Sequence, residues 1–412
     1  MTSQLILANG AGIALASDSA VTINRSRTYE SAEKICELPD PHRLAVMSSG
    51  NGLRDRLPVE VLLKEWIRSL PAEQDQSVEN YRDDFVSWYG NKAERWRSVH
   101  NRDVAAWNSL LERVERLADF VNEDLDRAEE GEPPTDVVLE ALRRLNEDLD
   151  HDAHVVSSAT AESILNHWWK PDNTLKKPRP SLEEAVHAIL GYIPRSETID
   201  EEIRTFLRLV VETGQGFPDG SWTTLNFVGY GANDLLPSVA HLKLGGSVEK
   251  TVFHYSHEPF ECKWAGASYA LIETAAQADI INLILHGWNP ELSREATSVA
   301  IDSLYTSGDL DSPDQEPEGQ VGPQEDRLGS SKAAMIEAVE TAFRDLTAGR
   351  WINRTSKTLA VMPLLDLAAA AEALVTVQAL TLDIRGHLPS VGGHIDVATI
   401  TVNEGFRWIS HS

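Results

Sequence analysis

The sequence is poor in cysteine, in positive charge and in long uncharged apolar runs. Its 412 residues hold two cysteines, Cys36 and Cys262, which excludes a disulfide framework and fits a reducing compartment. Lysine and arginine number 37 against 64 aspartates and glutamates. The net charge of −27 argues against binding nucleic acid or anionic membranes, because phosphates are held by dense Lys and Arg. The most apolar long segment, 364–382, carries Asp366 and Glu372, which a bilayer-spanning helix would rarely tolerate, so no membrane span is expected.

Several functional motifs are also missing. The start of the chain, Met1 to Leu5, lacks the basic segment and apolar stretch of a secretory signal, so we expect a cytoplasmic protein. No G-x-x-x-x-G-K-[ST] loop for ATP occurs. No metal or cofactor is expected, because two histidine clusters lack the paired spacing and fourth ligand of a zinc site: His151 with His154, and His254 and His257 with Cys262.

Short strands separated by turns are expected over the first fifty residues. Residues 4–8 and 12–17 are apolar or β-branched and flank Asn9-Gly10, a strong hairpin signal. Residues 35–38 and 43–49 repeat the pattern. A helix is expected from Pro58, because apolar side chains then recur at helical spacing.

The middle of the chain has a different character. Residues from about 72 to 220 are acidic, rich in tryptophan and helical in pattern, and capping-box spacing predicts helix starts at Ser181 and Thr198. Strands and helices follow. We expect strands at 223–230, 238–244, 248–255, 395–402 and 406–409, helices at 268–285, 331–346 and 364–383, and a mobile linker at 306–331, which is rich in Asp, Glu, Pro and Gly.

Thr2, Asp18 and Lys34 are the candidate chemical residues. Sixteen positions separate each from the next; Asp18 ends the second expected strand and Lys34 opens the third. Antiparallel neighbours of this length could bring all three side chains to one end of a sheet. Taken singly, each also has an ordinary explanation: Asp18 as a turn residue and Lys34 as a solvated strand-edge residue.

This pattern resembles the proteasome β-subunit and HslV family of N-terminal-nucleophile (Ntn) hydrolases. Members begin, after processing, with Thr at a strand start, then carry Asp in a D-S-x-V-T type context and Lys after the next loop, and the chain reproduces both intervals. An apolar strand ending in Gly50 precedes a helix, and the resemblance resumes at 227–230, at 266–268 and at V-G-G-H-I-D-V-A-T-I over 391–400. Matched segments cover somewhat under half of the chain.

The resemblance implies an α+β fold of a particular kind, a four-layer αββα sandwich. Residues 1–71 and 222–412 would form this discontinuous sandwich, with the linker 306–331 inside it. Residues 72–221 would be a large acidic helical insertion.

The resemblance also implies a role for each candidate residue. Once Met1 is removed, the Thr2 hydroxyl would attack an amide while the α-amine of Thr2 serves as base, since a free α-amine has a reference pKa of roughly 7.7–8.0. Lys34 would lower the proton affinity of the hydroxyl, and Asp18 would keep Lys34 charged and oriented. The backbone N–H of Gly50 would face the oxyanion of the tetrahedral intermediate.

The residues that orient the N-terminal amine in the family map less directly. The family has an acidic residue and then a serine before the Gly pair; the acidic position falls on Leu388, and the serine position falls on Val391 or, with a one-residue shift, on Ser390. A further supporting serine maps near Ser268.

Three functions follow as hypotheses. The first is a threonine peptidase within a homo-oligomer, which in the resembled family is a ring, acting on peptides or unfolded protein with a separate ATPase as unfolding partner. The second is a catalytically inactive scaffold or binding protein of the same fold. The third is a small-molecule amidase or acylase with the same nucleophile.

Overall fold

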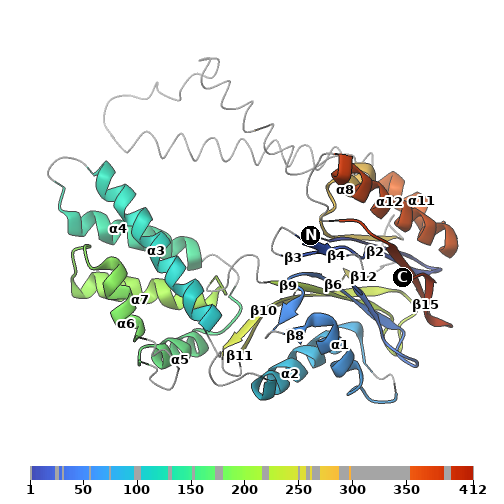
Figure 1. Ribbon diagram of the computed structural model, residues 1–412, viewed down its shortest axis with the longest axis horizontal. Coiled ribbons are helices and arrows are strands. Elements are labelled where there is room, and N and C mark those ends of the chain that lie inside the picture. Colours follow the sequence, from blue (N-terminus) through green and yellow to red (C-terminus); the bar gives the residue numbers. More distant parts are fainter. Residues whose placement is uncertain are drawn as a thin grey trace. The chain divides into compact units, whose positions relative to one another are not determined.

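The chain has an α+β architecture, with ten helices and a set of antiparallel sheets among the residues that the structure describes (Figure 1). This computed structural model describes residues 2–23, 27–29, 32–54, 57–73, 76–96, 104–128, 132–150, 154–171, 180–215, 222–248, 251–256, 260–261, 270–286, 297, 353–384 and 391–411. Internal contacts divide the chain into two compact units. The first comprises Met1–Ile35, Asn233–Ser238 and Phe260–Ser412, and the second Cys36–Ala232 and Val239–Pro259.

The first unit contains a five-stranded sheet in the order β13-β1-β2-β14-β15. Its strands are β1 (Ser3–Asn9), β2 (Gly12–Asp18), β13 (Leu271–Ala276), β14 (Ile395–Thr401) and β15 (Gly405–Ser410). The expected hairpin is confirmed, because Asn9 pairs with Gly12 and the Asn9 side chain accepts a hydrogen bond from the Ala11 amide at 2.8 Å. Every residue of β1 and β2 is buried, so these central strands are covered on both faces.

Three helices belong to the same unit: α8 (Asp279–His286), α11 (Asn353–Ala360) and α12 (Leu364–Ile384). They lie along one face of the sheet (Figure 1) and share an apolar cluster with β1 and β2 that includes Leu5, Leu7 and Leu367. The buried Gln378 of α12 accepts a hydrogen bond from the Ile280 amide at 2.8 Å, which ties α12 to α8.

Among the described residues, α12 alone is long and apolar enough to cross a membrane, with a mean hydropathy of 1.5 over an 18-residue window of which 39% is buried. Length and composition are weak criteria, since the core helix of a globular protein also meets them. Here the buried side of α12 packs on β1, β2 and β14. The short strands β3 (Val21–Ile23) and β4 (Arg27–Tyr29) form a separate hairpin.

The second unit contains a sheet in the order β11-β10-β9-β6-β5. Its strands are β5 (Ile35–Glu37), β6 (Leu44–Gly50), β9 (Thr223–Gly229), β10 (Ser238–Val248) and β11 (Thr251–Ser256). The short strands β7 (Leu53–Arg54) and β8 (Leu57–Pro58) pair with each other, and β12 (Phe260–Glu261) belongs to the first unit. Helices α1 (Val59–Ile67) and α2 (Val78–Trp96) pack against it. Trp66 lies at the centre of this core, with ring centroids 5.4 Å from Phe85 and 5.8 Å from Phe227.

Five further helices of the second unit form an apolar cluster that also includes Phe253 of β11. They are α3 (Val104–Arg127), α4 (Pro134–Asp150), α5 (Ser158–Trp168), α6 (Leu182–Leu190) and α7 (Glu197–Glu212). Trp107 and Trp168 meet edge to face within it, 6.0 Å apart. The helical character expected for 72–220 is thus confirmed where the chain is described.

The two expected helix starts have different outcomes. The capping box at Ser181 is confirmed, since its hydroxyl accepts from the Glu184 amide and Glu184 accepts from the Ser181 amide. The start at Thr198 is wrong. Helix α7 begins at Glu197, and Ser196 is its cap because its hydroxyl accepts from the Ile199 amide at 3.2 Å.

The helix expected over 268–285 is also wrong in its first half. Residues Leu271–Ala276 form strand β13, which pairs antiparallel with β1, and the helix α8 starts only at Asp279. Pairing with β1 decides the outcome, because a neighbouring strand overrides the helical preference of an Ala-containing segment. The linker expected at 306–331 and the helix at 331–346 lie outside the described residues.

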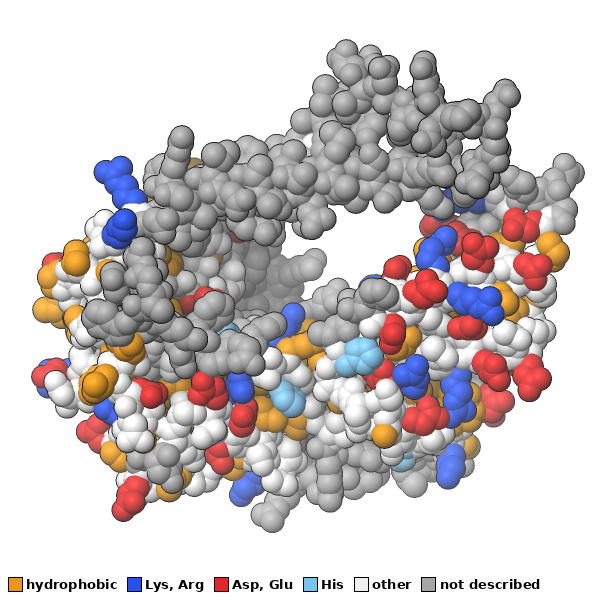
Figure 2. Space-filling model, turned by 180° about the vertical axis from the view of Figure 1, so that it is seen from behind, with side chains coloured by type: hydrophobic (Ala, Val, Ile, Leu, Met, Phe, Trp, Pro, Cys, Tyr) orange, Lys and Arg blue, Asp and Glu red, His pale blue; other side chains and the backbone are white. Residues whose placement is uncertain are grey.

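The molecular surface reflects the excess of acidic residues. On the face in Figure 2, Asp and Glu side chains are spread over the described surface, with Lys and Arg side chains between them.

Candidate functional site

Asp18 collects three hydrogen-bond donors at the end of β2. Its Oδ1 accepts from the Ser3 amide at 2.8 Å and from Lys34 Nζ at 2.7 Å, and its Oδ2 accepts from the Gly392 amide at 3.1 Å. The carboxylate is fully buried, with 0% exposure. Three donors, one of them charged, compensate a carboxylate that is removed from water.

Lys34 lies directly before β5 and is also buried, with 5% of the residue exposed. Burial lowers the pKa of Lys34 below its usual 10.5, while the ion pair with Asp18 and the charge of Asp396 act in the opposite direction. The carboxylates of Asp18 and Asp396 stabilise the charged form of Lys34, whereas its burial away from water destabilises that form more strongly. Its proton is therefore more easily shared with a neighbouring group than that of a solvated lysine.

Thr2 is buried beside this pair. It is 8% exposed, and its carbonyl oxygen accepts from the Gln277 amide at 2.8 Å, just beyond β13. The peptide bond that joins Thr2 to Ser3 donates its N–H to the same Asp18 oxygen that binds Lys34. The structure thus brings Thr2, Asp18 and Lys34 together, because Lys34 Nζ and the amide that follows Thr2 both donate to Asp18 Oδ1.

The C-terminal Gly pair fixes the backbone around Asp18. The carbonyl of Gly392 accepts from the Ala20 amide at 3.1 Å, and the carbonyl of His394 accepts from the Ser19 amide at 3.0 Å. Gly393 has φ of +74°, a conformation that favours glycine. This explains why a Gly-Gly motif near the end of the chain belongs to a site formed at its beginning.

The positions expected to orient the N-terminal amine lie mostly outside the described part of the chain. Ser268, Ser390 and Leu388 lie outside the described residues. Val391, the alternative for the serine position, is fully buried in an apolar contact with Ala379 and Leu382 and brings no hydroxyl.

Gly50 lies at the end of β6, in the second unit. Its φ is +79°, and a Cβ at this position would stand 2.6 Å from the carbonyl oxygen of Trp222, so the position requires glycine. The backbone nearby is held in place, because the Asn51 amide donates to the same Trp222 carbonyl at 2.9 Å and Arg54 Nε donates to Thr223 Oγ1 at 2.9 Å.

Two carboxylates of the same sheet were not selected from the sequence. Asp396, on β14, is 2% exposed, accepts from His411 Nδ1 at 3.1 Å and acts electrostatically on Lys34. Glu273, on β13 opposite Ile6 of β1, has its pKa raised to about 7 by burial. The available signal was an acidic residue inside an otherwise apolar strand, at I-D-V-A-T-I and L-I-E-T-A.

The described residues contain no group of three or more His, Cys, Asp or Glu side chains placed to hold a metal ion. What the arrangement offers is proton chemistry, with a buried lysine and a buried carboxylate bound to the backbone next to Thr2. No known family model matches the chain, and no curated protein matches it either.

Proposed function

We propose that this chain is an Ntn hydrolase in which Thr2, freed by removal of Met1, cleaves an amide bond. The ion pair between Lys34 and Asp18, shared through one oxygen with the amide next to Thr2, carries this proposal. Burying a lysine and an aspartate costs desolvation free energy, and such buried ionisable pairs are concentrated at functional sites. The position of this pair beside Thr2 therefore supports a catalytic role for it.

The proposed fold is the four-layer αββα sandwich of the resembled family. Burial of β1 and β2 on both faces supports it, because a sheet covered on both faces needs a layer on each side. So do the helices α8, α11 and α12 on one sheet and α1 and α2 on the other. Of the insertion expected over 72–221, α2 packs on this sheet together with α1, so the proposed insertion is the part that holds α3 to α7.

The proposed reaction has two halves. Thr2 Oγ1 attacks the carbonyl carbon while the α-amine takes its proton; the C–N bond then breaks, and the leaving amine takes that proton from the α-amine. A water, deprotonated by the same α-amine, attacks the ester, so that the acid and free Thr2 are released. Lys34 stabilises the developing negative charge on Oγ1, and Asp18 fixes Lys34.

The backbone N–H of Gly50 is proposed to stabilise the oxyanion. One such donor contributes about 3–4 kcal/mol in the transition state of comparable hydrolases. In line with the resembled family, we propose a homo-oligomer acting on peptides in the cytoplasm with a separate ATPase, since the sequence contains no ATP loop.

Hydrolysis of two substrate classes tests the proposal. An unfolded polypeptide and a short acyl amide are incubated with the wild-type protein and with Thr2→Ala and Thr2→Ser variants. We expect cleavage by the wild type, none by Thr2→Ala and partial cleavage by Thr2→Ser, which keeps a hydroxyl and an α-amine. Cleavage of the polypeptide identifies a peptidase and cleavage of the acyl amide alone an acylase. Activity that persists in Thr2→Ala excludes Thr2 as nucleophile, and a processed wild type that cleaves neither substrate supports a scaffold.

A further inference from the structure

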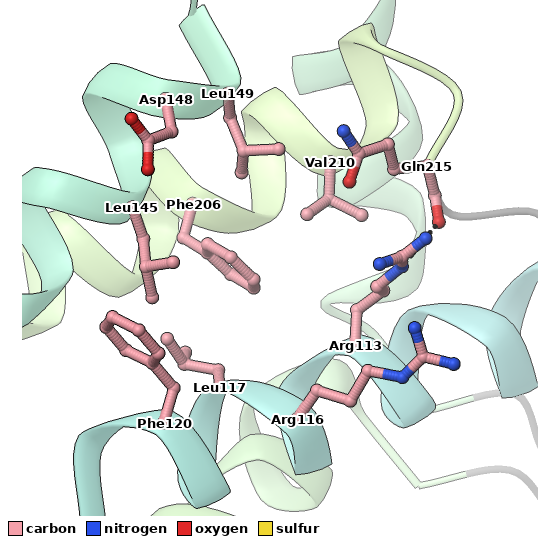
Figure 3. A pocket seen from close by; sticks show the side chains of 10 residues that line it. All are labelled: Arg113, Arg116, Leu117, Phe120, Leu145, Asp148, Leu149, Phe206, Val210 and Gln215. Carbon is pink, nitrogen blue, oxygen red and sulfur yellow. Dashed lines mark hydrogen bonds between the residues drawn. The ribbon is translucent and has the colours of Figure 1, made fainter. Parts of the chain in front are cut away.

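A cavity of about 410 Å³ lies among three helices of the second unit, α3, α4 and α7. Figure 3 shows its lining, with side chains from each helix directed toward a common space. The volume falls in the range of small-molecule sites, about 300–1,000 Å³. At ~30 Å³ for each water, it corresponds to about a dozen water molecules.

Most of the lining is apolar. Phe120 and Leu145 are partly buried at its edge, while Leu117, Phe206 and Val210 are buried and belong to the helical core. The site is a groove open to solvent on one side, since Arg116 and Asp148 at its rim are exposed. Its apolar wall favours an apolar occupant, because a ligand that covers the wall removes apolar surface from water.

Two arginines stand at one side of the cavity. Arg113 and Arg116 are one turn apart on α3, and both guanidinium groups lie on the side opposite Asp148 in Figure 3. Arg113 is oriented by a hydrogen bond from its Nε to the Gln215 carbonyl at 3.1 Å. Arg116 has no hydrogen-bond or ion-pair partner within the described part of the chain. The protein carries a net charge of −27, so two neighbouring arginines beside an apolar cavity make this part of the molecule suited to an anionic group.

We propose that this cavity binds a medium-chain carboxylate, such as a fatty acid, with its acyl chain against the apolar wall and its carboxylate on Arg113 and Arg116. The planar fork of a guanidinium matches a carboxylate in shape and charge. Asp148, at the opposite rim, disfavours a ligand with a second anionic end. A peptide is a poorer match, because the wall offers few partners for the amide groups that it would bring.

The proposed binding site is separate from the proposed hydrolase site. All lining residues belong to the helical part of the chain, and binding there does not require cleavage at Thr2. The cavity size suits a chain of about ten carbons, which has about a dozen non-hydrogen atoms.

Calorimetric titration of the full chain with hexanoate, octanoate and decanoate tests the proposal. We expect saturable binding of one decanoate, with affinity rising about fourfold per added methylene while the cavity has room. Decanol, of equal length but uncharged, should bind at least tenfold more weakly. Decanol binding as tightly as decanoate, or no saturable binding of decanoate, would overturn the proposal.

Variants locate the binding. Arg113→Gln combined with Arg116→Gln should weaken decanoate binding at least tenfold and leave decanol binding unchanged. Arg127→Gln is the matched control, because it removes an exposed arginine of the same helix about 16 Å further along its axis. Circular dichroism confirms that each variant is folded. Equal decanoate affinity in the double variant and the wild type would show that the cavity is not the site.

A peptide with a free C-terminal carboxylate, acetyl-Leu-Phe, separates the fatty acid from the peptide alternative. We expect it to bind more weakly than decanoate. Tighter binding of the peptide, lost in the double variant, would contradict the fatty-acid proposal.

Discussion

Asp18 connects the residues of the candidate site to one another. Its carboxylate binds Lys34, the amide that follows Thr2 and the amide of Gly392, so three separate parts of the sequence meet at two oxygens. The spacing of Thr2, Asp18 and Lys34 predicted that these residues could share a sheet end. This spacing did not predict that the Gly392 amide binds Asp18, because any residue except proline has a backbone N–H and so the residue type does not reveal it.

Lys34→Met should remove hydrolysis and lower stability together. The change leaves the Asp18 carboxylate buried without its cation, which typically costs about 3–5 kcal/mol of unfolding free energy. Adding Asp18→Asn removes the uncompensated charge and should restore part of the stability but none of the activity. Urea unfolding and amide hydrolysis measure the two effects separately.

Lys64→Met is the matched control, since the pair of Lys64 with Glu60 is exposed on α1 and should contribute under about 1 kcal/mol. If Lys34→Met kept full activity, Lys34 would have no part in the reaction.

Glu273 should make stability depend on pH. Because the fold raises its pKa from 4.5 to about 7, the native state binds more protons than the unfolded state between these values. The contribution of Glu273 to stability therefore falls as pH rises through this window and stays low above it. Glu273→Gln should raise the melting temperature at pH 8 and have little effect at pH 5. An equal effect at both pH values would contradict the raised pKa.

At the scale of helices and strands, local signals predicted most elements near the ends of the chain. The hairpin at Asn9-Gly10 and helix α12 follow from turn chemistry and apolar composition, which act within a few residues. Strand β13 was predicted as helix, because its partner β1 lies some 270 positions away and pairing over that distance has no local signature. For the same reason the cavity among α3, α4 and α7 was not predicted from the sequence.

Gly50→Ala should destabilise the end of β6. A positive φ costs a residue with a side chain about 1–2 kcal/mol, and the new Cβ would meet the Trp222 carbonyl at 2.6 Å, so a loss above ~2 kcal/mol is expected. Gly52→Ala is the control, since nothing lies within 4 Å of a Cβ there, and should change stability by less than about 0.5 kcal/mol. Urea unfolding of both proteins checks this, and equal stability would contradict the strained geometry at Gly50.

At the scale of the whole molecule, charge is the dominant feature. The chain carries −27, and acidic side chains are distributed over the visible surface rather than gathered in one patch (Figure 2). Such a surface favours solubility and repels nucleic acid, but it also destabilises the folded state by self-repulsion.

Sodium chloride should therefore raise the melting temperature. The Debye screening length falls from about 30 Å at 0.01 M salt to about 8 Å at 0.15 M. This weakens the repulsion between surface charges more than it weakens the buried ion pair of Lys34 and Asp18. Differential scanning fluorimetry over this range measures the effect. A melting temperature that falls with salt would show that exposed ion pairs outweigh the repulsion.

Covalent labelling tests the central claim most directly. The purified chain is incubated with a β-lactone or an epoxyketone, and its intact mass and peptide map are recorded. We predict that Met1 is absent, that one adduct forms on Thr2, and that Lys34→Met forms none. A protein that retains Met1, or one with a free Thr2 that never acquires an adduct, would contradict an N-terminal threonine nucleophile.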